Sequence, residues 1–356
     1  MELRTLGFDE WFADRAREIC TPGSTVARVT AVDRDRYLVR DEVGELPAEL
    51  TGRYRHDMAG TDQLPCVGDG VCVRLLDARS HAIIDRLLPR RSFLRRKVAG
   101  RDVEFQMIAA NIDVALIVQA CHFDFNVRRL ERYLVMVHEG HIRPIVLLTK
   151  ADLVARDVLD EMIAELRRAG LDVPVIPVSN LTGDGIDEVR RCLPPGTTCC
   201  LLGSSGVGKS TLIYRLAADA SLRTGGVSQT GEGRHTTTRR QLFVLEGGRL
   251  LVDMPGMREL GLLAVDAGLA ETFTDIGTLA ASCRFGDCSH GGEPGCAVRA
   301  AIERGECTEQ HLHNYLKLRR ESAHHDMSHV ERRRKDREFG RLVRSVLKHK
   351  GRGEPR

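Results

Sequence analysis

The stretch Gly203-Ser-Ser-Gly-Val-Gly-Lys-Ser-Thr211 fits the pattern G-x-x-x-x-G-K-[ST]. A short apolar run at 199–202 precedes it, as expected of a buried strand, and the run at 211–217 predicts a helix. Backbone N–H groups of such a glycine loop close around phosphates, and the positive end of the helix dipole adds to the attraction. In this pattern Lys209 reaches the β- and γ-phosphates while Ser210 holds Mg²⁺. The stretch therefore predicts a site for a nucleoside triphosphate.

Length and composition set broad limits on the rest of the chain. At 356 residues it exceeds one typical domain, and its 42% apolar content can support several cores. The net charge of +3 says little about partners, and no apolar run is long enough to span a membrane. The N-terminus carries Glu2 and Arg4 rather than an apolar signal core. The 11 scattered cysteines, an odd number, favour reduced thiols in the cytoplasm over a disulfide framework.

Short β-like segments separated by turn residues run from residue 25 to about residue 88. The segments lie at 25–32, 37–40, 44–50, 71–76 and 81–88. Strands at this spacing predict a small barrel. We favour a five-stranded oligonucleotide/oligosaccharide-binding (OB) barrel, a fold that binds nucleic acid through its loops and one sheet face. An amphipathic helix is expected before the barrel, at 9–20.

Two basic segments accompany the predicted barrel. Arg53, Arg55 and His56 surround Tyr54 in an expected loop, which either meets phosphate and bases or is simply solvated. Pro89–Lys97 is expected to be a linker that ends the first domain, its charge either solvated or in contact with RNA. Both interpretations of each segment stay open from sequence alone.

From Ile112 onward, strand-like and helix-like segments alternate. Strands are expected at 114–119, 144–148, 173–178 and 199–202, a hairpin at 241–246 and 249–253, and helices at 127–139, 157–169 and 185–192. This alternation predicts a mainly parallel sheet with helices on both faces. Ligands of such sheets bind at the carboxyl ends of the strands, which is where the motifs described next fall.

Asp253-Met-Pro-Gly256 follows the last of these strands and matches the D-x-x-G element that senses a γ-phosphate. In that role Asp253 binds Mg²⁺ through water, and the Gly256 N–H faces the γ-phosphate. Arg234-His-Thr-Thr-Thr238 lies upstream, in a segment rich in Gly, Ser and Thr. We expect Thr237 to complete the Mg²⁺ shell of a switch loop, the alternative being a merely flexible loop.

Thr149-Lys-Ala-Asp152 resembles the guanine-reading element N-K-x-D. The Asp152 carboxylate accepts hydrogen bonds from guanine N1–H and the 2-amino group, which adenine does not offer, so it selects GTP over ATP. The Lys150 stem packs over the base. Thr149 replaces the usual Asn, and because a hydroxyl makes fewer hydrogen bonds than an amide, we expect a weaker contact there. Ser179-Asn180 is expected to back the base through main-chain N–H groups.

The order of these motifs is itself informative. In most GTPases the phosphate loop comes first and the base-reading elements last, whereas here the base-reading elements precede residue 203. That order indicates a circularly permuted GTPase domain. The expected nucleotide-binding residues are Gly203, Ser204, Ser205, Gly206, Val207, Gly208, Lys209, Ser210, Thr211, Thr149, Lys150, Ala151, Asp152, Ser179, Asn180, Thr237, Asp253 and Gly256.

The residue that orients the attacking water is less evident. Met257 follows the D-x-x-G element, where many GTPases carry a water-orienting Gln. Because methionine cannot orient water, we expect slow intrinsic hydrolysis or help from another group. His235 is the candidate catalytic residue, and the competing interpretation is that it orders the loop or contacts a partner.

A cluster of soft ligands lies near the C-terminus, in the pattern Cys283-x4-Cys288-x-His290-x5-Cys296. Three thiolates and one imidazole at short spacing suit one tetrahedral structural Zn²⁺ with no open position for catalysis. The alternative is a group of free cysteines near a turn. Cys307 falls outside this spacing. Helices are expected around the cluster at 262–281, 296–303 and 308–324.

The last part of the chain, beyond Val330, is rich in Arg and Lys. Such tails bind nucleic acid by releasing counterions, although a solvated, partly helical end has the same composition.

Taken together, the motifs resemble one family, the circularly permuted, small-ribosomal-subunit-dependent GTPases of the RsgA (YjeQ) type. The resemblance covers about residues 25–325. It is carried by Asn111-Ile-Asp113, Asp124-Phe-Asn-Val-Arg-Arg-Leu-Glu-Arg-Tyr-Leu134, Gly203–Thr211, Gly233-Arg-His-Thr-Thr-Thr238, Asp253-Met-Pro-Gly256, Cys283-Arg-Phe-Gly-Asp-Cys-Ser-His290 and Glu293-Pro-Gly-Cys296.

The resemblance implies a cytoplasmic GTPase that acts late in assembly of the bacterial small ribosomal subunit. GTP binding would dock it on ribosomal RNA, and hydrolysis to GDP, stimulated by the subunit, would release it. We expect a monomer with no membrane contact. The expected domains are an N-terminal helix (1–24), the OB-type barrel (25–97), the permuted GTPase domain with its mostly parallel sheet (98–262), a helical zinc-binding domain (263–330) and a basic tail (331–356).

Two other classes remain open. A metabolic P-loop kinase or ATPase is disfavoured by Asp152 and by the lack of a separate substrate domain. An RNA-binding scaffold with a vestigial nucleotide site is disfavoured because Lys209, Ser210 and Asp253 are all present. A binding competition between GTP and ATP distinguishes the first class from a GTPase. The rate of GTP turnover with added small subunits distinguishes the second.

Overall fold

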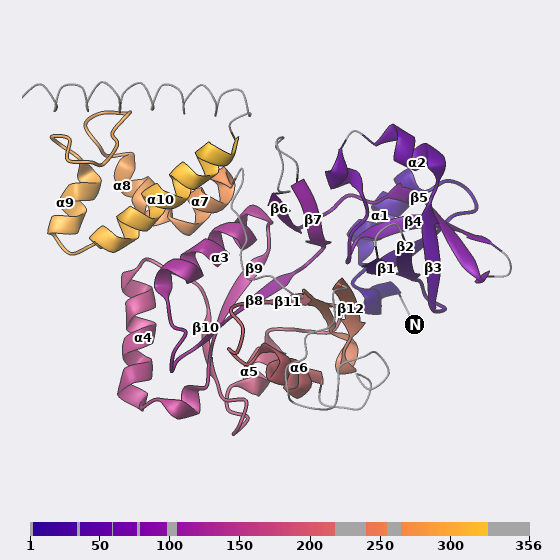
Figure 1. Ribbon diagram of the computed structural model, residues 1–356, viewed down its shortest axis with the longest axis horizontal. Coiled ribbons are helices and arrows are strands. Elements are labelled where there is room, and N and C mark those ends of the chain that lie inside the picture. The colour runs from indigo at the N-terminus through magenta and orange to yellow at the C-terminus, as the bar shows by residue number, and fades with distance from the viewer. Residues whose placement is uncertain are drawn as a thin grey trace, which may run out of the picture.

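The computed structural model describes residues 3–33, 36–58, 60–76, 79–97, 105–217, 240–254 and 265–326. A β-barrel, an α/β sheet with its helices and a helical C-terminal part follow one another along the longest axis (Figure 1). Within these ranges no helix has the length and apolar character needed to cross a membrane.

Five strands form the barrel: β1 (Thr25–Asp33), β2 (Arg36–Arg40), β3 (Glu45–Leu50), β4 (Gly70–Leu76) and β5 (His81–Leu87). They pair in the order β1-β2-β3-β5-β4, and β4 pairs back onto β1 to close the barrel. Alternate side chains point inward, as along β3, where Leu46, Ala48 and Leu50 are buried between exposed neighbours. The predicted five-stranded OB-type barrel is confirmed.

The N-terminal helix α1 (Glu10–Ile19) lies at one end of the barrel, after the short 3-10 helix η1 (Leu3–Leu6). The Asp9 carboxylate caps α1 by accepting from the Trp11 and Phe12 N–H groups. Its apolar face packs on β4, which brings Cys20 next to Cys72, and the two form a disulfide. The expectation of reduced thiols was therefore wrong for this pair, although the other cysteines are free.

Both basic segments differ from expectation. Residues expected in a loop form the short helix α2 (Gly52–Asp57), with a Thr51 cap and no buried residue, followed by the 3-10 helix η2 (Thr61–Gln63). The expected linker contains strand β6 (Phe93–Lys97), which pairs with β7 (Phe105–Ala110). The linker expectation failed because Ser92 and Leu94 are buried while Phe93 and Arg95 are only half-buried, an alternation that the basic residues conceal.

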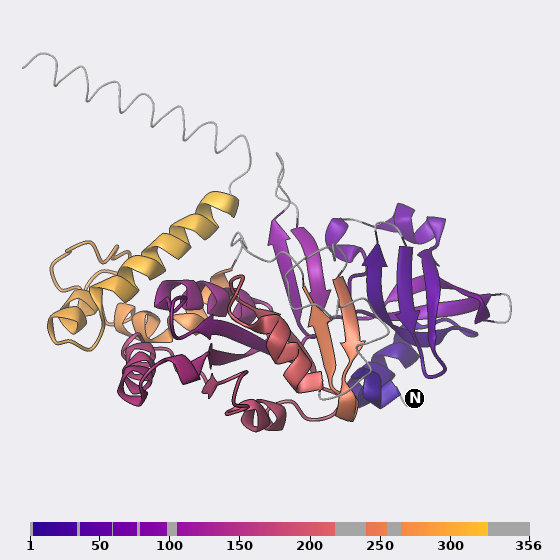
Figure 2. The same ribbon diagram turned by 60° about the horizontal axis from the view of Figure 1, so that its bottom comes forward.

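The α/β part contains β8 (Val114–Ala120), β9 (Arg143–Thr149), β10 (Val175–Val178), β11 (Thr198–Leu202), β12 (Arg240–Val244) and β13 (Leu250–Asp253). They pair in the order β10-β9-β8-β11-β13-β12, all parallel except β12. The hairpin of β12 and β13, joined by the 3-10 helix η6 (Glu246–Gly248), is as predicted. Figure 2 shows these two orange strands beside the barrel, where β12 pairs with β1.

Helices cover both faces of this sheet, as predicted. On one face, α3 (Val127–Glu139) and α4 (Arg156–Arg168) share a core with Ala115 and Ile117 of β8. On the other, α5 (Ile186–Arg191) and α6 (Lys209–Ala217) share a core with Leu116 and Val118. Successive β8 side chains thus enter opposite cores, which is why the strand is a continuous apolar run.

Within residues 265–326, the C-terminal part contains four helices: α7 (Asp266–Thr272), α8 (Thr274–Ala280), α9 (Ala297–Glu303) and α10 (Glu309–Asp326). The single helix expected before the cysteine cluster is broken at Phe273, whose backbone is not helical and whose ring is buried against His311 and Tyr315. Its expected start, at 262–264, lies outside the described residues. Gly268 lets α7 approach α3 closely, since a Cβ there would lie 2.0 Å from the Val135 carbonyl oxygen.

A buried polar network joins α10 to α3 and α8. The His311 imidazole lies 2.5 Å from the Glu131 carboxylate through Nδ1 and 3.2 Å from the Asp275 carboxylate through Nε2, and Asn314 donates to Glu131. Burial alone would lower the pKa of His311, but hydrogen bonds and charge from Asp275 and Glu131 outweigh it and raise the pKa to about 9. A protonated His311 therefore holds the C-terminal helices against the α/β part.

Candidate functional site

The predicted motifs meet at one edge of the parallel sheet. The phosphate-loop stretch follows β11, the base-reading stretch follows β9, Ser179 follows β10 and Asp253 ends β13. These strands are neighbours through β8, and all run in the same direction, so their carboxyl ends lie together.

The loop between β11 and α6 is shaped by glycine at its start. Gly203 has φ +142°, and a Cβ there would lie 2.2 Å from the Val118 carbonyl oxygen, so only glycine fits against β8. Lys209, the first residue of α6, donates from Nζ to the carbonyl oxygens of Gly203 and Ser204 at 2.8 and 2.6 Å. Ser210 and Thr211 are exposed on the first turn of the helix. The loop thus presents its amine, hydroxyls and helix N-terminus together.

Thr149 connects the base-reading loop to the phosphate loop. Its hydroxyl lies 2.7 Å from the Val207 carbonyl oxygen and 3.1 Å from that of Gln119, and the side chain is fully buried. A hydroxyl donates only one hydrogen, and the shorter distance assigns that hydrogen bond to the Val207 carbonyl oxygen. At this position the structure has a link between two loops, and the guanine contact of Thr149 stays a prediction.

Lys150 and Asp152 lie directly beyond this link. Lys150 has a left-handed backbone, with φ +56°, and its Nζ lies 4.4 Å from the centroid of the Phe123 ring. Asp152 lies in the 3-10 helix η4 (Ala151–Leu153) with its carboxylate exposed. Both side chains are therefore accessible at the sheet edge.

The turn after β10 contacts the phosphate-loop region directly. The Ser179 hydroxyl accepts from the N–H groups of Leu181 and Thr182, which fixes the turn. Asn180 donates from Nδ2 to the Gly208 carbonyl oxygen at 3.1 Å. Arg215 of α6 donates to the carbonyl oxygens of Asn180 and Leu181. These bonds hold the turn, the loop and α6 as one unit.

The γ-phosphate side of the predicted site is only partly described. Asp253 is half-buried at the end of β13, opposite Gln241 of β12. Three predicted site residues, His235, Thr237 and Gly256, lie outside the described residues, as does Met257.

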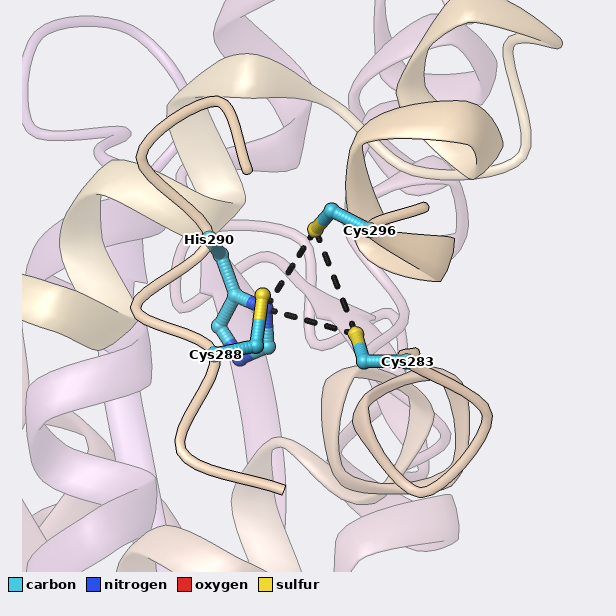
Figure 3. Close-up of side chains that lie close together, drawn as sticks. All are labelled: Cys283, Cys288, His290 and Cys296. Atoms are coloured by element: carbon cyan, nitrogen blue, oxygen red, sulfur yellow. Dashed lines mark hydrogen bonds between the residues drawn. The ribbon is translucent and has the colours of Figure 1, made fainter. Parts of the chain in front are cut away.

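The predicted metal ligands Cys283, Cys288, His290 and Cys296 converge, with their ligand atoms all within 4.8 Å of one another (Figure 3). The Cys283 and Cys296 sulfurs lie 4.0 Å apart, and the His290 Nδ1 lies 3.7 and 3.5 Å from them. Tetrahedral Zn²⁺ with Zn–S bonds of about 2.3 Å requires sulfurs roughly 3.8 Å apart, so the residues fit that ion. Cys307 is buried elsewhere, as expected.

The surroundings of the cluster hold its loop in place and act on one of its thiols. Burial opposes ionisation of Cys283, but hydrogen bonds from the Ala297 and Val298 N–H groups at the start of α9 lower the pKa of its thiol. The Glu293 carboxylate accepts from N–H groups of Ser289 and two following glycines, which fixes the loop. The cluster therefore lies on a fixed loop, and the start of α9 favours ionisation of one of its thiols, Cys283.

Several residues at these sites were not singled out from sequence. Phe123 and His122 follow β8 and form an edge-to-face pair next to Lys150. The exposed, apolar Phe123 after a buried strand was the available signal. The pairing of His311 with Glu131 carried no signal, because the two lie far apart in the sequence.

A phosphate loop, an upstream base-reading loop and a downstream acid on one parallel sheet define a circularly permuted P-loop GTPase fold. The crystal structure of YloQ, titled a circularly permuted GTPase, shares this fold, with a TM-score of 0.59, 24% identity and coverage of 83% of this chain and 93% of that one. The crystal structure of YjeQ from Thermotoga maritima has a TM-score of 0.63 and 26% identity, covering 83% and 97%.

Sequence comparison gives the family. Residues 87–263 match the RsgA GTPase family. The chain is 43% identical to the small ribosomal subunit biogenesis GTPase RsgA 2 of Listeria monocytogenes, over 91% of this chain and 90% of that protein. It is 42% identical to the small ribosomal subunit biogenesis GTPase RsgA of Opitutus terrae, again over 91% of this chain and 90% of that protein. The chain belongs to the RsgA GTPase family, as its motifs predicted.

Proposed function

We propose that this protein hydrolyses GTP to GDP and phosphate, and that it binds the small ribosomal subunit during a late step of its assembly. The sheet edge that joins the phosphate loop, the base-reading loop and Asp253 carries the proposal. The names of the Listeria and Opitutus relatives, small ribosomal subunit biogenesis GTPases, support the choice of subunit.

At that edge the residues divide between phosphate and base. Lys209, which donates to loop carbonyls, turns toward the β- and γ-phosphates when GTP enters. Ser210 and Asp253 would hold Mg²⁺, with Thr237 completing its shell and the Gly256 N–H facing the γ-phosphate. Mg²⁺ neutralises charge on the phosphates. Asp152 selects guanine, and Ser179 and Asn180 support the base.

Hydrolysis is slow without the subunit in this proposal, because Met257 cannot orient water. His235 is the catalytic candidate, acting on the attacking water in a closed state of its switch segment. Its alternative role, in ordering that segment or contacting the partner, is decided by His235→Ala: unaltered subunit-stimulated turnover removes it from catalysis.

Contacts with ribosomal RNA come from the basic surfaces outside the nucleotide site. Helix α2 exposes Arg53, Arg55 and His56 on the barrel, and the basic tail follows α10. One structural Zn²⁺ in the cysteine cluster keeps the C-terminal helices in place. The protein acts as a cytoplasmic monomer, with domains at 1–24, 25–97, 98–262, 263–330 and 331–356.

Two measurements test the proposal. GTP should displace a bound guanine nucleotide at concentrations at which ATP does not, and ATP binding as tightly as GTP would favour the kinase or ATPase class. Purified small subunits should raise GTP turnover well above that of the protein alone. Turnover that does not respond to small subunits would favour the scaffold class.

A further inference from the structure

Phe123 occupies an unusual place beside the nucleotide site. It follows β8, whose carboxyl end lies between those of β9 and β11, and its side chain is 56% exposed. An ideal Cβ on Gly206 of the phosphate loop would lie 4.0 Å from the Phe123 ring. The ring therefore stands between the phosphate loop and the base-reading loop.

Lys150 contacts the face of this ring. The 4.4 Å from Nζ to the ring centroid is well within the range of a cation–π interaction. The lysine backbone is already fixed, because it is left-handed and the preceding Thr149 is tied to Val207. What remains free is the four-carbon side chain, which loses considerable rotamer entropy whenever it is held in one position.

We propose that Phe123 is a positioning residue for guanine-nucleotide binding, which holds Lys150 in the conformation that packs its stem over the base. This inference rests on the proposed function and names a residue that acts through Lys150. The entropy cost of ordering the lysine is met before the nucleotide arrives, so affinity rises by preorganisation. Because the base is common to GTP and GDP, both ligands gain equally.

The experiment uses the full chain and measures dissociation constants for GDP and a non-hydrolysable GTP analogue by calorimetry. Phe123→Leu keeps an apolar side chain but removes the aromatic face, and Phe123→Trp keeps the face. Lys150→Met removes the charge but keeps the stem. The matched control is Phe285→Leu, since Phe285 is 44% exposed and lies 5.4 Å from the Arg284 guanidinium, but on the metal-cluster loop.

Phe123→Leu should raise both dissociation constants by about 2- to 5-fold, the size of an exposed cation–π contact. Phe123→Trp should stay within about twofold of the wild type, and Phe285→Leu should match it. In the Lys150→Met background, Phe123→Leu should have no further effect, because its partner is gone. In turnover assays the KM for GTP should rise with the dissociation constant, and kcat should change less.

Two results would overturn the inference. One is an unchanged dissociation constant for Phe123→Leu, and the other is an equal loss in the Lys150→Met background, which would show that the ring acts without the lysine. Wild-type protein that binds ATP as well as GTP would instead defeat the proposed function. The wild-type competition thus separates the two failures.

Discussion

The metal cluster and the nucleotide edge are built in opposite ways. The cluster takes its four ligands from the single segment 283–296, on one loop and the start of α9. The nucleotide edge draws on the ends of strands far apart in sequence, and its loops are joined by bonds such as Thr149 to Val207 and Asn180 to Gly208. A local segment brings its ligands together by itself, whereas the edge exists only once the sheet has assembled in its permuted order.

The largest expected effect is the loss of zinc from the local cysteine cluster. Cys296→Ser should reduce zinc content from one ion per chain to almost none, since a structural site needs all four ligands. The C-terminal helices should then become sensitive to proteolysis. The matched control is Cys307→Ser, a buried thiol outside the cluster. Full zinc content in Cys296→Ser, measured by atomic emission, would contradict the assignment.

The disulfide between Cys20 and Cys72 is a long-range contact, since the two cysteines are 52 residues apart in the sequence. Its reduction should lower the free energy of unfolding by about 4 kcal/mol, because the unfolded chain regains the conformational entropy that the cross-link removes. Denaturant unfolding with and without a dithiol reductant measures this. Cys20→Ser should be insensitive to the reductant, and equal sensitivity in that variant would show that the effect arises elsewhere.

The network around His311 is a second long-range contact, and its contribution to the free energy of unfolding should depend on pH. The pKa of His311 is raised in the folded protein to about 9, above its ordinary value of about 6.5. Its stabilisation is therefore complete below about pH 6.5 and is lost as pH rises through about 9, a change of about 3 kcal/mol. His311→Gln should abolish this dependence in unfolding experiments, whereas His313→Gln, exposed on the same helix, should retain it.

The smallest effect concerns the link inside the nucleotide edge. Thr149→Val keeps the shape but removes the hydroxyl, leaving the Val207 carbonyl without its partner, which costs about 1–3 kcal/mol. Part of that loss should appear as weaker GDP binding, because the phosphate loop is no longer held. Thr149→Ser keeps the hydroxyl and should behave like the wild type. GDP affinity and stability equal to those of the wild type in Thr149→Val would show that the hydrogen bond to Val207 does not hold the phosphate loop.

Sequence reasoning succeeded where the determining pattern is local. The helix at 127–139, the strand and helix that flank the loop at 203–208, and the group of Cys283, Cys288, His290 and Cys296 each occupy one continuous segment, and the structure has each element to within a residue or two of its prediction. It failed where distant residues decide. The basic residues around Leu94 conceal strand β6, whose partner β7 lies beyond residues 98–104. The Cys20–Cys72 pair and the burial of Thr149 likewise depend on which elements pack together.

The most direct test of the account exchanges one atom at the base-reading loop. Asp152→Asn replaces a carboxylate oxygen with an NH₂ group, a donor that suits the C2 carbonyl of xanthine and not the 2-amino group of guanine. Dissociation constants of GDP and xanthosine diphosphate should be measured for both proteins. We predict that the wild type binds GDP tightly and that Asp152→Asn prefers xanthosine diphosphate. Unchanged preference for GDP in the variant would contradict guanine recognition by Asp152 at this edge.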